Sequence, residues 1–308
     1  MFRSSPMHRA SRIRFVVLLF ALAAPAPALA SHNGPNYCGV DIPDDEALGV
    51  VSLPTGDVFC PLLADPKSSG SFASWEHVSQ ESDFGTDIGS VGVYDRFGLI
   101  RWGGPEAGDG LELGIEGGIY AQFDLATPSY DLINADYTFG IPLTYRYGPF
   151  SSRLRVYHQS SHLGDEFLLR ADHPERENLS FESAEAILSC DLSILRIYGG
   201  GEYLFNQEPE RLKPHIVHGG IELRQRNPLF GSGGIHLVAA GDVKALERED
   251  WKLGYSVRAG LEMSRPRERT HVARRWMLLA EYYRGASPYG QFFRDDIEYA
   301  GLGIHFSP

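Results

Sequence analysis

Alternation of apolar and polar side chains limits what this chain can fold into. From about Phe72 onward the sequence breaks into segments of roughly ten to fifteen residues, separated by Gly, Pro, Asp or charged clusters. Residues 111–125 are the clearest case, with Leu113, Ile115 and Ile119 on one face and Glu112 and Glu116 on the other. A polar face of this kind suits a water-filled lumen better than a packed sandwich core. The pattern indicates an antiparallel barrel.

Twelve such segments can be delimited, and an even number is typical of bacterial outer-membrane barrels. The strands are expected near residues 70–78, 89–102, 111–125, 133–147, 151–162, 179–190, 193–206, 215–225, 233–244, 251–263, 274–284 and 296–306. The predicted fold class is all-β, an antiparallel transmembrane β-barrel of about twelve strands of the outer-membrane type. A soluble periplasmic β-sandwich or propeller is the alternative, although its outward strand faces should carry more charge.

The first thirty residues are typical of a secretory signal peptide: four arginines, an apolar run from Phe15 to Ala24, and a small-x-small site at Ala28-Leu29-Ala30. The expected organisation is therefore a signal peptide over 1–30, a periplasmic N-terminal segment over 31–66, and the barrel over 67–308. A formal charge of −12 argues against a nucleic-acid partner.

Turn lengths suggest an orientation, because bacterial barrels have short periplasmic turns and longer extracellular loops. The tightest connections are expected at 148–150 and 191–192, and the longer polar ones at 164–178, 207–214 and 285–295, which would be extracellular. In an oxidising compartment Cys38 and Cys60 could form a disulfide, which would leave Cys190 free in a strand.

His158 and Ser160 lie two positions apart near the end of the expected strand 151–162. Period-2 geometry puts both on the face of Leu154 and Val156, the face expected to meet lipid. Residues i and i+2 are about 7 Å apart at Cα, so the His158 imidazole could reach the Ser160 hydroxyl. Such a pair could act as base and nucleophile in ester hydrolysis.

A third residue that orients the base should come from the neighbouring strand. If Ala184, Ala186 and Leu188 face outward, Glu182 and Asn178 share the face of His158. Glu182 is the first choice as orienter and Asn178 the second. A simpler interpretation makes His158 an interface residue at the extracellular rim, where polar groups cost little.

Acidic residues gather in the loop that follows this strand. Asp165, Glu166, Asp172 and Glu175 offer the oxygen ligands that calcium prefers. Calcium bound through Asp165 and Glu166 is one expectation, and a solvated acidic loop is the other.

His158-Gln-Ser160-Ser161 is similar to the His-x-Ser motif of the outer-membrane phospholipase A and lipid A 3-O-deacylase barrels. In those families the Ser, the His and a third residue lie on the outer surface of the barrel. An Asn follows their nucleophile and helps to form the oxyanion hole, whereas this chain has Ser161 at that position. Ser161 is therefore the candidate that the resemblance implies for this role, and Gly164 is named with it as a supporting residue.

A longer resemblance covers Leu62 to Lys67 and Tyr157 to Arg170, which look like the domain of unknown function 1207 family of bacterial exported proteins. It implies outer-membrane-type β-structure from end to end and brings no established activity. Residues 299–306 resemble the C-terminal strand of outer-membrane proteins, which implies the barrel assembly machinery as a partner.

Two function classes follow for a protein of the outer membrane of a Gram-negative bacterium. The first is a lipid esterase or deacylase acting on outer-leaflet lipid, with Ser160 as nucleophile, His158 as base and Glu182 as orienter. The second is a non-enzymatic barrel, either a narrow channel or a structural protein. Whether the active form is a homodimer is open at this point.

Overall fold

The computed structural model describes residues 49–67, 70–79, 85–106, 108–169, 178–210, 212–231, 234–264 and 275–307. Within these ranges, no helix is both long and apolar enough to cross a membrane. The short helical elements are α1 (Asp165–Leu168) and the 3₁₀ turns η2 (Glu247–Glu249) and η3 (Gly290–Phe292).

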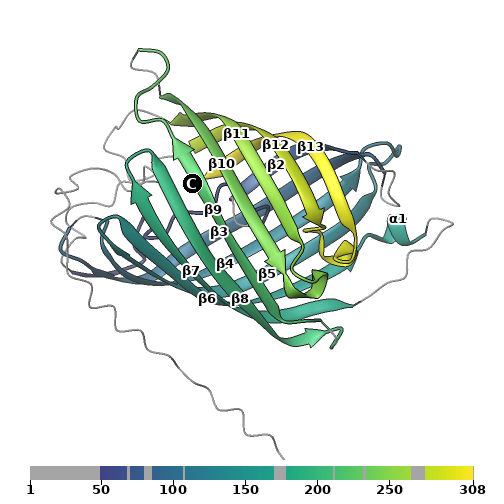
Figure 1. Ribbon diagram of the computed structural model, residues 1–308, viewed down its shortest axis with the longest axis horizontal. Helices are drawn as coiled ribbons and strands as arrows, with labels where there is room; N and C mark the ends of the chain where they lie inside the picture. The colour runs from purple at the N-terminus through teal and green to yellow at the C-terminus, as the bar shows by residue number, and fades with distance from the viewer. Residues whose placement is uncertain are drawn as a thin grey trace, which may run out of the picture. The chain divides into compact units, whose positions relative to one another are not determined.

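Twelve antiparallel strands close into a single barrel, in which each strand pairs with its neighbours in sequence and β2 pairs with β13 (Figure 1). The strands are β2 (Ser71–Val78), β3 (Asp87–Gly103), β4 (Gly110–Asp124), β5 (Leu132–Tyr147), β6 (Phe150–Leu163), β7 (Leu179–Leu192), β8 (Leu195–Glu208), β9 (His215–Arg224), β10 (Ile235–Leu246), β11 (Leu253–Ser264), β12 (Arg275–Ala286) and β13 (Asp296–Ser307). A short additional strand, β1 (Val50–Ser52), pairs with β3. The barrel predicted from the sequence is confirmed, and the sandwich alternative is wrong.

The two faces of the wall differ as the alternation predicts. In β4, Glu112, Glu116 and Gln122 are buried on the lumen side, while Ile119 points outward and is 46% exposed. The outward side chains along the other strands are largely apolar and exposed, among them Phe139, Ile141, Val156, Leu188, Ile221, Leu237, Leu278 and Leu302. An outward apolar surface of this extent suits contact with hydrocarbon.

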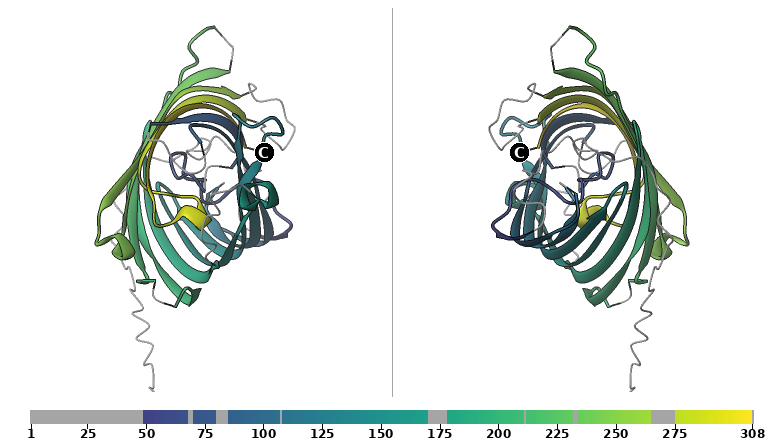
Figure 2. Two further views of the ribbon diagram at one scale, coloured as in Figure 1. Left: turned by 90° about the vertical axis from the view of Figure 1, so that its right-hand side faces the viewer. Right: turned by 90° about the vertical axis from the view of Figure 1, so that its left-hand side faces the viewer.

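A stretch of the N-terminal segment fills part of the lumen. Residues 55–67, here called the plug, run inside the ring of strands, where the chain is purple in Figure 2. Val58 and Leu62 are completely buried, and Phe59 is 1% exposed. This part of the expected N-terminal segment therefore lies inside the barrel.

Arginines of the wall hold the plug by its main chain. Arg101 donates to the carbonyl oxygens of Thr55 and Gly56, and Arg146 donates to that of Val58. Arg196 donates to the carbonyl oxygens of Cys60 and Pro61, and Arg258 donates to that of Leu63. Each also contacts a carboxylate of the wall: Glu112, Asp191, Glu222 and Glu281 in the same order. The plug's buried carbonyl groups therefore have charged donors as partners, which offsets their removal from water.

One end of the barrel is covered by an apolar cluster that includes Phe167 of α1 and Phe292 of η3, whose rings meet edge to face at 5.7 Å. The loop that carries η3 turns into the ring of strands, where it is yellow in Figure 2. Cys60 is disulfide-bonded and Cys190 is free, as expected; Cys38, the expected partner, lies outside the described residues.

Candidate functional site on the outer face

The His-x-Ser motif lies on β6, where burial alternates residue by residue. Leu154 and Val156 point outward and are 54% and 53% exposed, and His158 follows them on the same face. Arg153 and Gln159 point inward and are buried. The outward placement of His158 and Ser160 is thus as the alternation predicts.

His158 and Glu182 face each other on adjacent strands. The register between β6 and β7 pairs them directly, and His158 Nδ1 lies 3.2 Å from Glu182 Oε1. Their side chains are 45% and 29% exposed, on the outside of the barrel. If Nδ1 donates its proton to the carboxylate, Nε2 carries the lone pair that a general base needs. The structure therefore brings together the expected base and its first-choice orienter.

Ser160 lies beside this pair on the same face, partly buried between Tyr137 of β5 and Ser180 of β7. Among the described residues, its hydroxyl makes no hydrogen bond, so the expected contact with His158 is not made in this conformation. Hydrogen bonds of this kind often tighten only when substrate is bound.

Asn178, the second choice for the third residue, has another partner. Its Nδ2 donates to Glu208 Oε2 at 3.3 Å, across the pairing of β7 with β8. It therefore points away from the strand that carries His158. Glu182 is the only one of the two predicted orienters that contacts the imidazole.

The structure does not support the oxyanion roles expected for Ser161 and Gly164. Ser161 faces the lumen, where its hydroxyl donates to Asn134 Oδ1 at 2.9 Å and also contacts Asp136. The Gly164 N–H donates to the Ile133 carbonyl at 3.0 Å. Period-2 geometry places consecutive residues on opposite faces, so a side chain at 161 cannot serve a site built on 158 and 160.

Gly164 has a different, structural importance. A Cβ at this position would lie 1.9 Å from the carbonyl oxygen of Leu132. Only glycine allows β6 to end this close to β5. The residue therefore fixes the end of the strand that carries the motif.

The acidic loop begins with Asp165 and Glu166, which form the first turn of α1 and are both exposed. Asp172 and Glu175 lie outside the described residues. Calcium binding through Asp165 and Glu166 stays a prediction.

Sequence reasoning did not find the network that supports the motif from inside. Gln291 Nε2 donates to the Ser161 carbonyl at 2.7 Å, and the Gly290 N–H donates to Asp136 Oδ2 at 3.0 Å. Lys67, at the end of the plug, forms an ion pair with Asp136 at 2.6 Å. Inward polar positions on β5 were visible in the alternation, but nothing in the sequence shows that the plug and a distant loop meet there.

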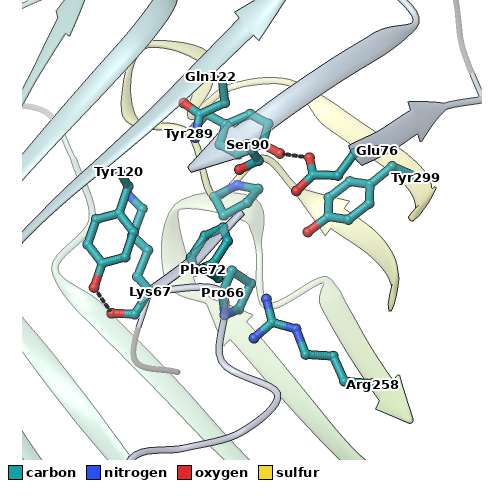
Figure 3. Close-up of a pocket in the computed structure, with 11 residues that line it drawn as sticks. Pro66, Lys67, Phe72, Glu76, Ser90, Tyr120, Gln122, Arg258, Tyr289 and Tyr299 are labelled. Atoms are coloured by element: carbon teal, nitrogen blue, oxygen red, sulfur yellow. Dashed lines mark hydrogen bonds between the residues drawn. The ribbon is translucent and has the colours of Figure 1, made fainter. Parts of the chain in front are cut away.

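Next to this network the lumen contains a small cavity between the plug, strands β2 to β4, Arg258 of β11, Tyr299 of β13 and the loop that carries η3 (Figure 3). Tyr120 donates to the Lys67 carbonyl at 2.6 Å, and Tyr289 donates to Glu76. Because these groups lie inside the wall, the cavity is separate from the lipid-facing site.

Comparison with known proteins agrees with the fold. The model of a family described as protein of unknown function (DUF1207) matches residues 27–307. Among curated protein sequences, none matches the chain.

Solved structures of two outer-membrane phospholipases are similar to this chain in fold. The outer membrane phospholipase A of Escherichia coli has a TM-score of 0.53 and 12% identity, over 78% of this chain and 90% of that one. The Salmonella typhi outer membrane phospholipase, solved as a dimer with bound calcium, has a TM-score of 0.52 and 12% identity, over 78% and 91%. At this identity the likeness concerns the fold alone.

Proposed function

The chain belongs to the DUF1207 family, and from that premise we propose that it is an outer-membrane lipid esterase that removes acyl chains from outer-leaflet lipid. One observation carries the proposal: His158 contacts Glu182 at 3.2 Å on the outward face, beside Ser160. A charged or polar pair on the face that meets lipid costs free energy. A lipid substrate would explain why the polar pair lies on this face despite that cost.

In the proposed reaction, Ser160 Oγ attacks the carbonyl carbon of an acyl ester while His158 Nε2 takes the hydroxyl proton. The tetrahedral intermediate expels the alcohol, which receives that proton from His158, and an acyl-serine remains. A water molecule then attacks the acyl-serine with His158 again as base, and the fatty acid leaves as Ser160 regains its proton. Glu182 holds the imidazole and stabilises its positive charge.

A donor for the oxyanion is needed as well. Ser180 is the hydroxyl that the strand register places directly across from Ser160 on the outward face. We assign it the role that the sequence resemblance gave to Ser161. Removal of one oxyanion donor typically lowers kcat by about 10²–10³.

Calcium, dimerisation and cell location belong to the same proposal. The apolar outer surface suits the outer membrane of a Gram-negative bacterium, where outer-leaflet lipid is the substrate and the barrel assembly machinery inserts the protein. Calcium near Asp165 and Glu166 would lie beside the anionic headgroups. A homodimer across the outer face would enclose the site. The phospholipase of Salmonella typhi, which is similar in fold, was solved as a dimer with calcium.

Acyl release from phospholipid and from lipid A by detergent-refolded protein tests the proposal, with and without calcium and with chemical cross-linking to detect dimers. Ser160→Ala should abolish release, and Glu182→Gln should lower it. Ser152→Ala is the matched control, because Ser152 lies on the same strand away from the pair. Release that is equally absent from wild type and Ser160→Ala, with folded barrels in both, would refute the esterase.

A non-enzymatic barrel is the second candidate. The plug and the apolar cluster at one end favour a structural protein over an open channel, because wall arginines hold the plug at four points along its main chain. Conductance in planar bilayers separates the two, since a filled lumen should pass no steady current.

A further inference from the structure

Three ionisable side chains meet inside the lumen, on adjacent strands and away from the outer-face site. Glu185 of β7, Glu202 of β8 and His218 of β9 are all buried, and their ligand atoms lie within 4.8 Å of one another. The register pairs Glu185 directly with Glu202. Each strand of this part of the wall therefore contributes one side chain to a single cluster, called here the lumen triad.

His218 is the unusual member of the lumen triad. It is 3% exposed, and neither of its ring nitrogens makes a hydrogen bond within the described structure. Asp242 Oδ2 lies 3.5 Å from Nδ1, beyond the usual length of a hydrogen bond. Buried imidazoles normally have a partner on at least one nitrogen, so the two nitrogens of this ring are available to a ligand.

The two carboxylates of the triad differ in their partners. Glu185 is paired with Arg153 at 2.8 Å and with Arg155 at 2.6 Å. Among the described residues, Glu202 accepts hydrogen bonds only from neutral groups, Tyr157 at 2.7 Å and Ser183 at 3.2 Å. A buried carboxylate in contact with no cation is stabilised by a positive partner.

We propose that the lumen triad binds a divalent transition-metal ion such as Zn²⁺ or Mn²⁺. One imidazole and two carboxylates form a donor set that suits these ions, whereas Ca²⁺ and Mg²⁺ prefer oxygen ligands alone. The ion would give Glu202 the cation that none of its direct contacts supplies. Asp242 is placed to orient the ring through Nδ1, which leaves Nε2 for the ion, as carboxylates commonly do for metal-binding histidines.

The ion would join three neighbouring strands next to the plug. Asp65 of the plug contacts Lys244 at 3.4 Å, and the strand register pairs Lys244 with His218. Metal binding at the triad therefore stabilises the wall where the plug is held. This function is structural and does not depend on the esterase proposal.

Metal titration of the full-length, detergent-refolded protein tests this inference. After treatment with EDTA and dialysis, wild type should bind one equivalent of Zn²⁺ or Mn²⁺ by calorimetry, and the ion should raise the temperature at which the heat-modifiable folded band is lost. His218→Gln should weaken binding at least tenfold and remove the thermal shift. The glutamine amide of His218→Gln can still donate to the carboxylates. If His218→Gln does not fold, Glu202→Gln tests the same metal site.

Matched controls separate the triad from other histidines. His158→Gln removes the outer-face pair, which could itself attract Zn²⁺, and His305→Gln removes another buried lumen histidine, bonded to Glu281. Both should bind the ion as wild type does. Absence of binding by wild type, undiminished binding by His218→Gln, or equal stabilisation by Ca²⁺ and Mg²⁺ would overturn the proposal.

Discussion

Arg196 is the wall arginine whose replacement tests most sharply how the plug is held. Its side chain is completely buried, donates to the Cys60 and Pro61 carbonyls at 3.1 and 3.2 Å, and contacts Glu222 at 3.4 Å. Glu222 in turn accepts the Leu63 N–H at 2.9 Å. Arg196→Met keeps much of the side-chain volume but leaves the Glu222 charge without its cation.

The expected loss of stability follows from that uncompensated charge. Removing one partner of a buried ion pair costs about 3–5 kcal/mol, whereas replacing both is often nearly neutral. Arg196→Met should therefore lower the free energy of unfolding by about 3–5 kcal/mol, and Arg196→Met/Glu222→Gln should recover a large part of it. Arg284→Met is the control: its contact with Glu298 is exposed and should contribute less than about 1 kcal/mol.

Urea unfolding in detergent micelles, followed by heat-modifiable migration, measures these differences. Protease digestion of the folded protein adds a local readout, because a released plug becomes cleavable while the barrel stays intact. A loss under about 1 kcal/mol for Arg196→Met, or an equal loss in the single and double variants, would refute the account of the plug.

Three further predictions concern the supports of the site and of the plug. Gly164→Ala should lower stability and activity together, since its Cβ would lie 1.9 Å from a β5 carbonyl oxygen; wild-type melting would contradict this. Gln291→Ala removes the 2.7 Å bond to the Ser161 carbonyl and should cost about 1 kcal/mol in urea unfolding. Burial alone would raise the pKa of Asp65, but Lys244 and other neighbouring charges lower it below the usual carboxyl range. The stability that Asp65 contributes is then present above about pH 4 and lost as pH falls toward its folded pKa, so Asp65→Asn should flatten the acid limb of a stability–pH curve.

The barrel could be predicted closely because strand alternation is a local property of the sequence. The strand expected at 111–125 is observed at Gly110–Asp124, and the one expected at 151–162 at Phe150–Leu163. The same local period placed His158 and Ser160 on the outward face, and the partnership with Glu182 needed only the register of adjacent strands.

Features that depend on distant contacts could not be predicted in this way. The plug contains a short apolar run, Leu62-Leu63-Ala64, but its partners are arginines on four separate strands. Ser161 was expected at an oxyanion hole because of a resemblance that covers a few residues, and the period of the strand turns it inward instead. The lumen triad likewise draws one residue from each of three strands, with no spacing that forms a known motif.

The proposal that Ser160 is an activated nucleophile can be tested without knowing the lipid. A fluorophosphonate with a long alkyl chain reacts covalently with serines that a neighbouring base activates, and peptide mass spectrometry locates the adduct. The account predicts one adduct, on Ser160, that is lost in His158→Gln and retained in Ser152→Ala. No adduct on folded wild type, or labelling that is unchanged in His158→Gln, would contradict it.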